Sequence, residues 1–338
     1  MLKEGIYEQL ITTSLQEKIS ELSSEKFFVA QTPIDKEEAA SILSEYLISL
    51  IHLALRELKG DSIRSQIEFT NEIIRFIDEK VNLDSDDSLI TIEGKILTAV
   101  LDKLGKTDKQ LEVELKRKIP QTGLSVSNLF TGSNSDISID TEIERDILSA
   151  DKIYWIISFI RWSGLRIFEK TLREFTARNG AELKIITTTY MGATEARALE
   201  FLAKLPNTQI KISYQTKIER LHAKAYIFSR NTGFDTAFIG SSNLSKSALT
   251  KGLEWNLRVT SQENPHIIEK AKATFDHYWN SIDFEDFNVG GISKFKEAIK
   301  QEKQRDNVVS INDYFRINPF PFQKEVLEKL QVEREFYS

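Results

Sequence analysis

Residues 221–228 read Leu-His-Ala-Lys-Ala-Tyr-Ile-Phe, and the polar run Ser-Arg-Asn-Thr-Gly follows them directly. Alternating apolar and aromatic residues ahead of such a turn predict a β-strand. Because side chains alternate between the two faces of a strand, His222 and Lys224 point to the same side. We therefore expect an imidazole and an ammonium to share one space.

Two further strands are predicted shortly afterwards, over residues 236–239 and 253–259. Between them, Gly240-Ser-Ser-Asn243 reads as a polar turn ahead of a helix, and phosphate binds readily at such helix starts. Glu254 is in the last of these strands, and from there its carboxylate can lie behind His222. The three segments together predict one polar site at neighbouring strand ends.

These side chains favour metal-free attack on a phosphodiester. His222 is the expected nucleophile, oriented and made more basic by Glu254. Lys224, Asn243 and Ser241 are expected to neutralise charge on the phosphoryl oxygens in the transition state. The alternative is an ordinary packed or surface histidine, which is the commoner role of a lone histidine on a strand. Lys224 and the Gly-Ser-Ser-Asn turn favour the catalytic interpretation.

The pattern His222-x-Lys224, Gly240-Ser-Ser-Asn243 and Glu254 resembles the phospholipase D superfamily, with its nuclease branch the closer likeness, over roughly residues 135–285. The resemblance implies a covalent phosphohistidine intermediate and no metal. Family members combine two such motifs in one site, and this chain has one. The resemblance therefore implies a homodimer in which His222 of both protomers shares one site across a two-fold axis.

One position departs from the family pattern. The motif is His-x-Lys-x4-Asp, and Ser229 stands where the resemblance places the aspartate. The departure counts more against a lipase than against a nuclease. The departure also leaves open the alternative of a module that binds the phosphate without cleaving the phosphodiester.

Five segments are predicted along the chain. They are a mainly helical N-terminal domain at 1–118, a linker at 119–140, an α/β phospholipase D-like domain with a mixed sheet flanked by helices at 141–285, a connecting helix or linker at 286–314, and the start of a truncated helicase domain at 315–338. In the first segment we expect helical spacing over residues 1–22, helices over 36–59, 62–81 and 92–104, and a strand over 26–30.

The α/β segment alternates strands with helices. Strands are predicted over 152–160, 183–188 and 210–214, with helices over 165–178, 195–204 and 265–279. Ligands gather at the carboxyl ends of strands in open α/β sheets. Arg161 and Ser163, which close the first of these strands, are therefore candidate substrate-binding residues, together with Ser242 of the polar turn.

Charge is unevenly distributed. The whole chain carries a net charge of -6, yet residues 151–260 hold 17 Lys and Arg against 9 Asp and Glu, a balance of +8 that leaves -14 for the remainder. Such asymmetry indicates a surface that binds the DNA backbone, although a solvated face of a mixed α/β domain is the alternative.

Composition indicates a cytoplasmic protein. The chain has no cysteine, so disulfides and cysteine-ligated zinc are excluded. We expect no membrane contact, since we find no apolar run approaching the length of a membrane span.

Residues 315–330 carry a second resemblance, to the entry segment of superfamily 2 helicases. It implies that Phe322 and Gln323 contact adenine in a full-length protein. No Gly-x4-Gly-Lys-Ser/Thr motif is present, so ATP and Mg²⁺ are expected only for a missing motor part, with no cofactor for the nuclease module. The combination resembles type IV modification-dependent restriction enzymes, which implies a larger helicase-containing polypeptide acting on cytosine-modified DNA in phage defence.

Two other functions stay open. One is a catalytically silent DNA-binding and dimerisation module of a helicase. The other is a lipid phosphodiesterase, which is expected to need an apolar or membrane-binding entrance.

Overall fold

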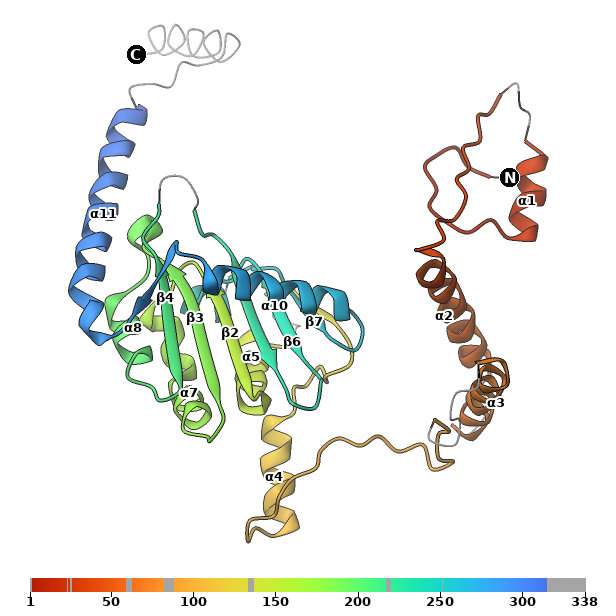
Figure 1. Ribbon diagram of the computed structural model, residues 1–338, viewed down its shortest axis with the longest axis horizontal. Helices are drawn as coiled ribbons and strands as arrows, with labels where there is room; N and C mark the ends of the chain where they lie inside the picture. Colours follow the sequence, from red (N-terminus) through yellow and green to blue (C-terminus); the bar gives the residue numbers. More distant parts are fainter. Residues whose placement is uncertain are drawn as a thin grey trace, which may run out of the picture. The chain divides into compact units, whose positions relative to one another are not determined.

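The computed structural model describes residues 2–22, 24, 26–58, 63–81, 88–132, 137–216, 220–250 and 252–314 (Figure 1). It divides into two compact units, residues 1–100 and residues 101–338. The helicase-like segment with Phe322 and Gln323 lies outside the described residues.

Unit 1 is helical, as predicted. Its helices are α1 (Thr13–Ser20), α2 (Ala39–Glu57) and α3 (Arg64–Val81). Among the described residues of this unit, Ile67 of α3 is the one buried apolar side chain. Unit 1 therefore has no apolar core of its own within the described residues.

Two elements predicted for unit 1 are absent. Residues 26–30 and 92–104 form neither strand nor helix. Instead, the buried Asn71 side chain holds the backbone N–H and C=O of Ile90, both at 2.9 Å, and Gly94 turns the chain with a φ of 57°. The prediction of a helix over 92–104 was wrong because apolar spacing alone does not stabilise a short helix without a partner to pack against.

Helix α2 bears on a second expectation, that no apolar run approaches the length of a membrane span. It has 19 residues and reaches a mean hydropathy of 1.3, and none of that window is buried. By length and composition alone, it is the one helix in the described part of the chain that could cross a membrane, although core helices of soluble proteins pass the same test. The apolar run was missed because Ser, Glu and His residues interrupt it.

Unit 2 is built on one mixed sheet of eight strands. Its spatial order is β1-β7-β6-β5-β2-β3-β4-β8. The strands are β1 (Asn128–Phe130), β2 (Lys152–Ile157), β3 (Glu182–Thr188), β4 (Thr208–Ser213), β5 (Lys224–Ser229), β6 (Thr236–Gly240), β7 (Asn256–Thr260) and β8 (Phe284–Phe287). Strands β2, β3 and β4 run parallel, and every other pair in the sheet is antiparallel.

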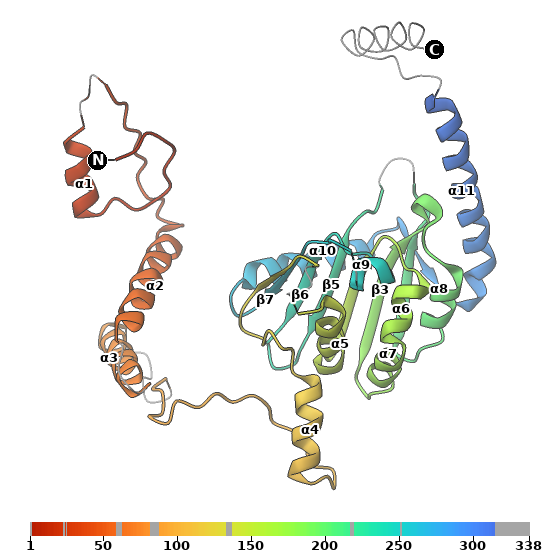
Figure 2. The same ribbon diagram turned by 180° about the vertical axis from the view of Figure 1, so that it is seen from behind.

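Helices cover both faces of this sheet (Figures 1 and 2). The helices of unit 2 are α4 (Asp108–Lys118), α5 (Ile139–Ser149), α6 (Trp162–Leu165), α7 (Glu169–Thr176), α8 (Ala196–Leu202), α9 (Lys246–Thr250), α10 (Pro265–Asn280) and α11 (Ile292–Tyr314), with short 3-10 turns η2 (Arg166–Phe168), η3 (Tyr190–Gly192) and η4 (Val289–Gly291). Helix α10 covers one face and packs Ile268 and Phe275 on the strands. Helices α5 to α8 cover the larger core on the other face.

The central strands are buried on both faces. Ile153, Trp155 and Ile157 of β2 face the α5 side, while Ile156 faces α10. A strand covered on both sides needs nearly continuous apolar sequence, and the run from Ile153 to Ile157 has it. A mixed sheet flanked by helices was predicted and is confirmed.

The start of unit 2 differs from the predicted linker. Helix α4 packs on α5 and falls within unit 2, so the division lies at residue 100 rather than at 118. The buried Glu142 carboxylate accepts hydrogen bonds from the backbone of Gln121 and Thr122. Residues 128–130 then form the edge strand β1 against β7. Buried side chains and strand pairing thus tie a Gly-, Ser- and Pro-containing stretch to the domain.

Candidate active site

One edge of the sheet collects the predicted residues because of the strand directions. The parallel strands β2 and β3 end at this edge, and the antiparallel neighbour β5 begins there. Strand β6 runs against β5 and ends there at Gly240, and β7 begins beside it. Segments 158–161, 189–192, 220–224 and 240–244 therefore meet, as the ends of parallel strands do in other open sheets.

His222 and Lys224 lie together at this edge. The Lys224 Nζ is 3.0 Å from His222 Nδ1 and 3.2 Å from His222 Nε2, and it donates to the His222 backbone carbonyl at 2.6 Å. Lys224 is buried, while His222 is exposed. The predicted juxtaposition of an imidazole and an ammonium is therefore present.

Asn243 is linked to the His222 site by a hydrogen bond to Phe159. Its Oδ1 accepts a hydrogen bond from the Phe159 backbone N–H at 3.1 Å, and the Phe159 ring lies edge-on to the His222 ring with centroids 5.7 Å apart. The Asn243 oxygen is thereby occupied, so the side-chain amide N–H groups are the donors left for a ligand.

Gly240 and Gly164 permit the backbones to approach closely here. A Cβ at Gly240 would stand 2.2 Å from the carbonyl oxygen of Trp255, and a Cβ at Gly164 would stand 2.5 Å from the backbone of Leu244 and Ser245. Any side chain at these positions would push the 240–245 turn away from its neighbours. These glycines therefore help to set the position of Asn243.

Glu254 acts on Lys224 rather than directly on the imidazole. Burial lowers the pKa of the Lys224 ammonium, and the nearby Glu254 carboxylate opposes part of that effect. Among the described residues, no hydrogen bond joins Glu254 to His222. The carboxylate therefore lies near the site, and its electrostatic partner is the ammonium.

The hydroxyl groups of Ser241 and Ser242 form hydrogen bonds within the protein. Ser241 Oγ accepts a hydrogen bond from the Trp255 N–H at 3.1 Å. Ser242 is fully buried, and its Oγ accepts from the Asn256 side chain at 2.8 Å. Ser242 thus has no open path to substrate, and the direct phosphate contact predicted for Ser241 competes with a bond inside the turn.

The candidates after β2 lie at the same edge. The Arg161 N–H donates to the Leu244 carbonyl at 2.9 Å, and Ser163 Oγ accepts from the Lys246 N–H at 3.5 Å. The Arg161 side chain is exposed. Both residues are therefore within the group of segments that surrounds His222.

Sequence reasoning missed three residues at the same end of the sheet as His222. Phe159 follows β2, Tyr190 follows β3, and Arg220 precedes β5. The ring centroids of Phe159 and Tyr190 are 6.5 Å apart, and the Arg220 guanidinium lies 5.4 Å from the Tyr190 centroid. The available signal was their position at the ends of predicted strands, the same argument that selected Arg161.

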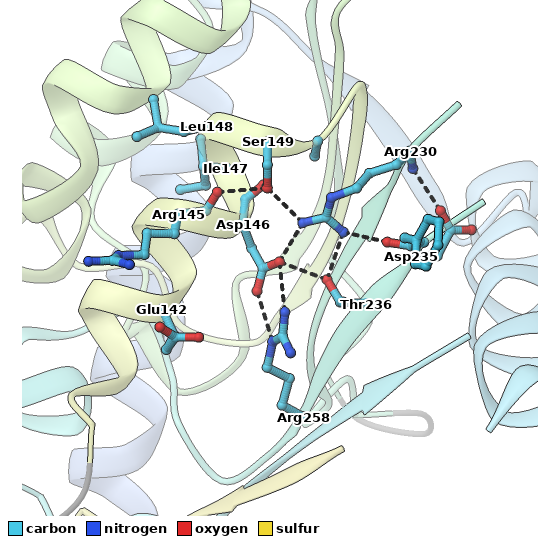
Figure 3. A network of polar contacts seen from close by, with 12 residues as sticks. Glu142, Arg145, Asp146, Ile147, Leu148, Ser149, Arg230, Asp235, Thr236 and Arg258 are labelled. Carbon is cyan, nitrogen blue, oxygen red and sulfur yellow. Dashed lines mark hydrogen bonds and ion pairs between the residues drawn. The ribbon is translucent and has the colours of Figure 1, made fainter. Parts of the chain in front are cut away.

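The far end of β5 holds a different polar cluster (Figure 3). The buried Asp146 carboxylate of α5 accepts from Arg230 at 2.5 Å, from Arg258 at 3.0 and 3.2 Å, and from Thr236 at 2.9 Å. Burial by itself raises the pKa of Asp146, but Arg258 and Arg230 outweigh burial and hold the pKa below its ordinary value. We call this cluster of Asp146, Arg230, Thr236 and Arg258 the Asp146 lock; its groups bond to one another inside the fold.

Ser229 belongs to this end of the strand. Its hydroxyl accepts from the Lys272 ammonium at 3.0 Å, and the same lysine pairs with Asp235. Ser229 and His222 are separated by the whole length of β5, about 20 Å for six extended residues. The departure from the family motif at Ser229 therefore leaves the groups around His222 unchanged.

No group of three or more His, Cys, Asp or Glu side chains suited to a metal ion occurs in the part of the chain that the structure describes.

Comparison with known proteins agrees with the fold of unit 2. The family model described as "Cardiolipin synthase, PLD-like domain" matches residues 143–279, which are 137 of the 338 residues. Together with the mixed sheet, this match confirms a phospholipase D-like fold for that part of the chain. A search of the curated proteins found no match.

Solved structures similar to this chain include NucT, Nuc and a polyphosphate kinase. NucT from Helicobacter pylori is 21% identical with a TM-score of 0.34, and the alignment covers 45% of this chain and 94% of NucT. Nuc from Salmonella typhimurium, a phospholipase D family member, is 18% identical with a TM-score of 0.37, covering 48% and 100%. Polyphosphate kinase from Porphyromonas gingivalis is 12% identical with a TM-score of 0.32, covering 45% and 22%.

Proposed function

We propose that this protein is a metal-independent phosphodiesterase that cleaves DNA through a phosphohistidine intermediate. One observation carries the proposal. An exposed imidazole, His222, has a buried ammonium 3.0 Å from its ring, at an edge where several strand ends meet. The imidazole is accessible to a phosphodiester, and the ammonium is placed to neutralise phosphoryl charge.

In the proposed reaction, a His222 ring nitrogen attacks phosphorus and the P–O bond to one nucleoside breaks. The departing oxygen takes a proton from a general acid. Water then attacks the phosphohistidine, the P–N bond breaks, and a phosphomonoester leaves while the proton of the water returns to the acid. Water is the second substrate, and no oxidant is required.

The geometry refines the expected roles. Lys224 and the amide N–H groups of Asn243 stabilise the phosphoryl oxygens, and Glu254 keeps Lys224 charged against the effect of burial. Ser241 supports the turn that carries Asn243. Arg161 is proposed to contact a flanking phosphate because its side chain is exposed beside this turn.

We propose that the general acid is His222 of a second copy, in a homodimer. An exposed apolar surface beside the site supports this pairing. Leu129, Leu257 and Ile239 are cross-strand neighbours on β1, β7 and β6, and they are 49%, 43% and 38% exposed. Trp255, whose backbone bonds to Ser241, is 62% exposed. Apolar residues gathered in this way are typical of protein–protein contacts.

The surface charge supports a polyanionic substrate, with one adjustment. Two of the 17 basic residues in 151–260, Arg230 and Arg258, are buried around Asp146 and cannot contact DNA. Arg161, Arg220 and Lys246 are exposed and flank the His222 edge. A basic rim around the site is what backbone phosphates require.

The proposal includes an ATP-dependent motor in the same polypeptide, on the strength of the helicase-like sequence at 315–330. In this form the protein acts in restriction of phage DNA, with modified cytosine as the proposed target and the cytoplasm as its compartment.

Cleavage of DNA in the presence of EDTA tests the function. The full chain is expected to cut in EDTA, and His222→Ala is expected to lose about 10⁴-fold or more of the rate. His277→Ala on α10, an exposed histidine elsewhere in unit 2, is the matched control and should retain the rate. A strict magnesium requirement, or undiminished cutting by His222→Ala, contradicts the proposed mechanism. DNA binding without cleavage in any condition supports the silent binding module instead.

A lipid phosphodiester is the second candidate substrate. Helix α2, long and apolar enough to lie in or across a bilayer, favours it. Hydrolysis of phosphatidylcholine vesicles by the wild-type protein but not by His222→Ala would support this alternative.

A further inference from the structure

An aromatic pair and an arginine stand beside the catalytic histidine without a role in the proposed chemistry. The Phe159 ring lies 5.7 Å from the His222 ring and 6.5 Å from the Tyr190 ring. Both aromatic side chains are half-buried, whereas the core aromatics Phe168 and Phe175 are completely buried. Phe159 and Tyr190 therefore retain surface for a ligand at the mouth of the site.

The backbone holds Tyr190 in this place. Its N–H donates to Thr188 Oγ1 at 3.1 Å, and the Thr189 N–H donates to the Ser213 carbonyl at 3.1 Å. Met191 follows with a φ of 58°, a left-handed conformation that non-glycine residues seldom adopt. Such strain is concentrated at ligand-binding positions, so the turn is consistent with a built site.

Arg220 adds a cation to the same surface. Its guanidinium lies 5.4 Å from the Tyr190 ring centroid, and its Nη1 approaches the Tyr190 hydroxyl at 3.5 Å. The Arg220 side chain is exposed. An aromatic ring with a neighbouring arginine offers stacking to a base and charge to the adjoining phosphate.

We infer that Phe159, Tyr190 and Arg220 form a stacking subsite that binds an unpaired nucleobase next to the phosphate attacked by His222. This inference rests on the proposed function and defines its substrate class as single-stranded or locally unpaired nucleic acid. A base inside a duplex is stacked on both faces and cannot place itself on a ring at the mouth of the site. Because every base has a π-face, the subsite selects for strand state and tolerates many sequences.

Binding is measured with the full chain carrying His222→Ala, so that no cleavage intervenes. Fluorescence anisotropy compares an oligothymidylate with a strand of equal length made of abasic residues. The base-bearing strand is expected to bind about 5- to 150-fold more tightly. Tyr190→Leu should remove most of that preference while leaving the affinity for the abasic strand unchanged, and Tyr190→Trp should keep the preference.

Arg173→Gln provides a matched control. Arg173 also stacks on an aromatic ring, that of Phe201 at 4.7 Å, and has no described contact with His222 or Phe159. The preference for bases should survive this substitution. Thermal melting of each variant verifies that it is folded.

The outcomes separate the inference from the function on which it rests. Cleavage in EDTA combined with equal affinity for the two strands overturns the stacking subsite and leaves the phosphodiesterase standing. Base-dependent binding by a protein that never cleaves overturns the phosphodiesterase and leaves the subsite standing. Equal loss of affinity for both strands in Tyr190→Leu overturns the subsite, since it places Tyr190 in phosphate contact or in support of the fold.

Discussion

The two ends of β5 carry cations on the same face of one strand, and their surroundings differ. Lys224 at the first end lies beside an exposed imidazole, and no described carboxylate is bonded to it. Arg230, just past the other end, is bonded to the fully buried Asp146. One cation is left available for an incoming anion, while the other is matched within the fold.

Whether a buried cation is bonded to a carboxylate indicates its role, in function or in stability, better than the residue type does. A buried ion pair acts as a structural element, because removing one partner leaves an uncompensated charge inside the fold. A buried cation whose counter-charge is only nearby is a candidate for substrate binding. The Asp146 lock and the His222 edge therefore predict opposite responses to mutation.

The largest effect on stability is expected at the Asp146 lock. Arg258→Ala leaves Asp146 with one guanidinium and removes the bond to the Gly123 carbonyl at 2.9 Å. We expect a loss of about 3–5 kcal/mol in the free energy of unfolding. Urea denaturation measures it. Arg117→Ala, which breaks the exposed pair with Glu174 at 2.7 Å, is the control and should change stability by less than about 1 kcal/mol.

Acid provides a second measurement on the same lock. The pKa of Asp146 is lowered in the folded state, so its contribution is complete above the unfolded value of about 3.9 and is lost as pH falls through the folded value. The wild-type protein should lose this stability below about pH 3.9. The acid loss should be smaller in Arg258→Ala, and an equal loss in both proteins would mean that Arg258 does not hold the pKa down.

A large effect on activity, without a loss of stability, is expected at the other end of β5. Lys224→Met keeps the apolar stem and removes the ammonium beside His222. We expect cleavage to fall about 10²- to 10³-fold, as when one transition-state donor is lost. The free energy of unfolding should stay the same or rise, because a desolvated cation is removed. Single-turnover cleavage measures the expected fall in rate, and urea denaturation of the same preparation measures the free energy of unfolding. A strongly destabilised Lys224→Met would mean that this lysine has a structural role.

The smallest effect is expected at Ser241. Its hydroxyl accepts from the exposed Trp255 backbone and is not needed for phosphate contact in our assignment. Ser241→Ala should change stability by about 0.5–1.5 kcal/mol and leave the cleavage rate near that of the wild type. A rate loss as large as that of Lys224→Met would restore Ser241 to direct stabilisation of the phosphoryl group.

Local patterns predicted much of unit 2. Alternation over 221–228 predicted a strand with His222 and Lys224 on one face. The observed strand β5 begins only at Lys224, so His222 lies in the segment just before it, still beside Lys224. The helix and strand spacing over 152–214 predicted the α/β order. Strands β1 and β8, of three and four residues, were missed. Such short segments carry too little pattern, since their stability comes from pairing with β7 and β4 rather than from their own sequence.

Unit 1 was harder to predict for the same physical reason. Apolar spacing was read as a helix over 92–104, yet the chain there is extended around turns, and Ile96, Leu97 and Val100 are exposed. Helix formation in proteins depends on tertiary packing of an apolar face. Where the described chain offers no packing partner, sequence periodicity overstates secondary structure.

The sequence by itself determined that His222 and Lys224 lie close together at the start of β5, because they are two positions apart in the chain. It could not determine that Arg258 is matched by Asp146, 112 residues away, or that Phe159, Tyr190 and Arg220 converge on His222. Those contacts depend on the order and direction of strands in the sheet. Only the tertiary structure decided which cations are neutralised inside the fold and which remain available to a substrate.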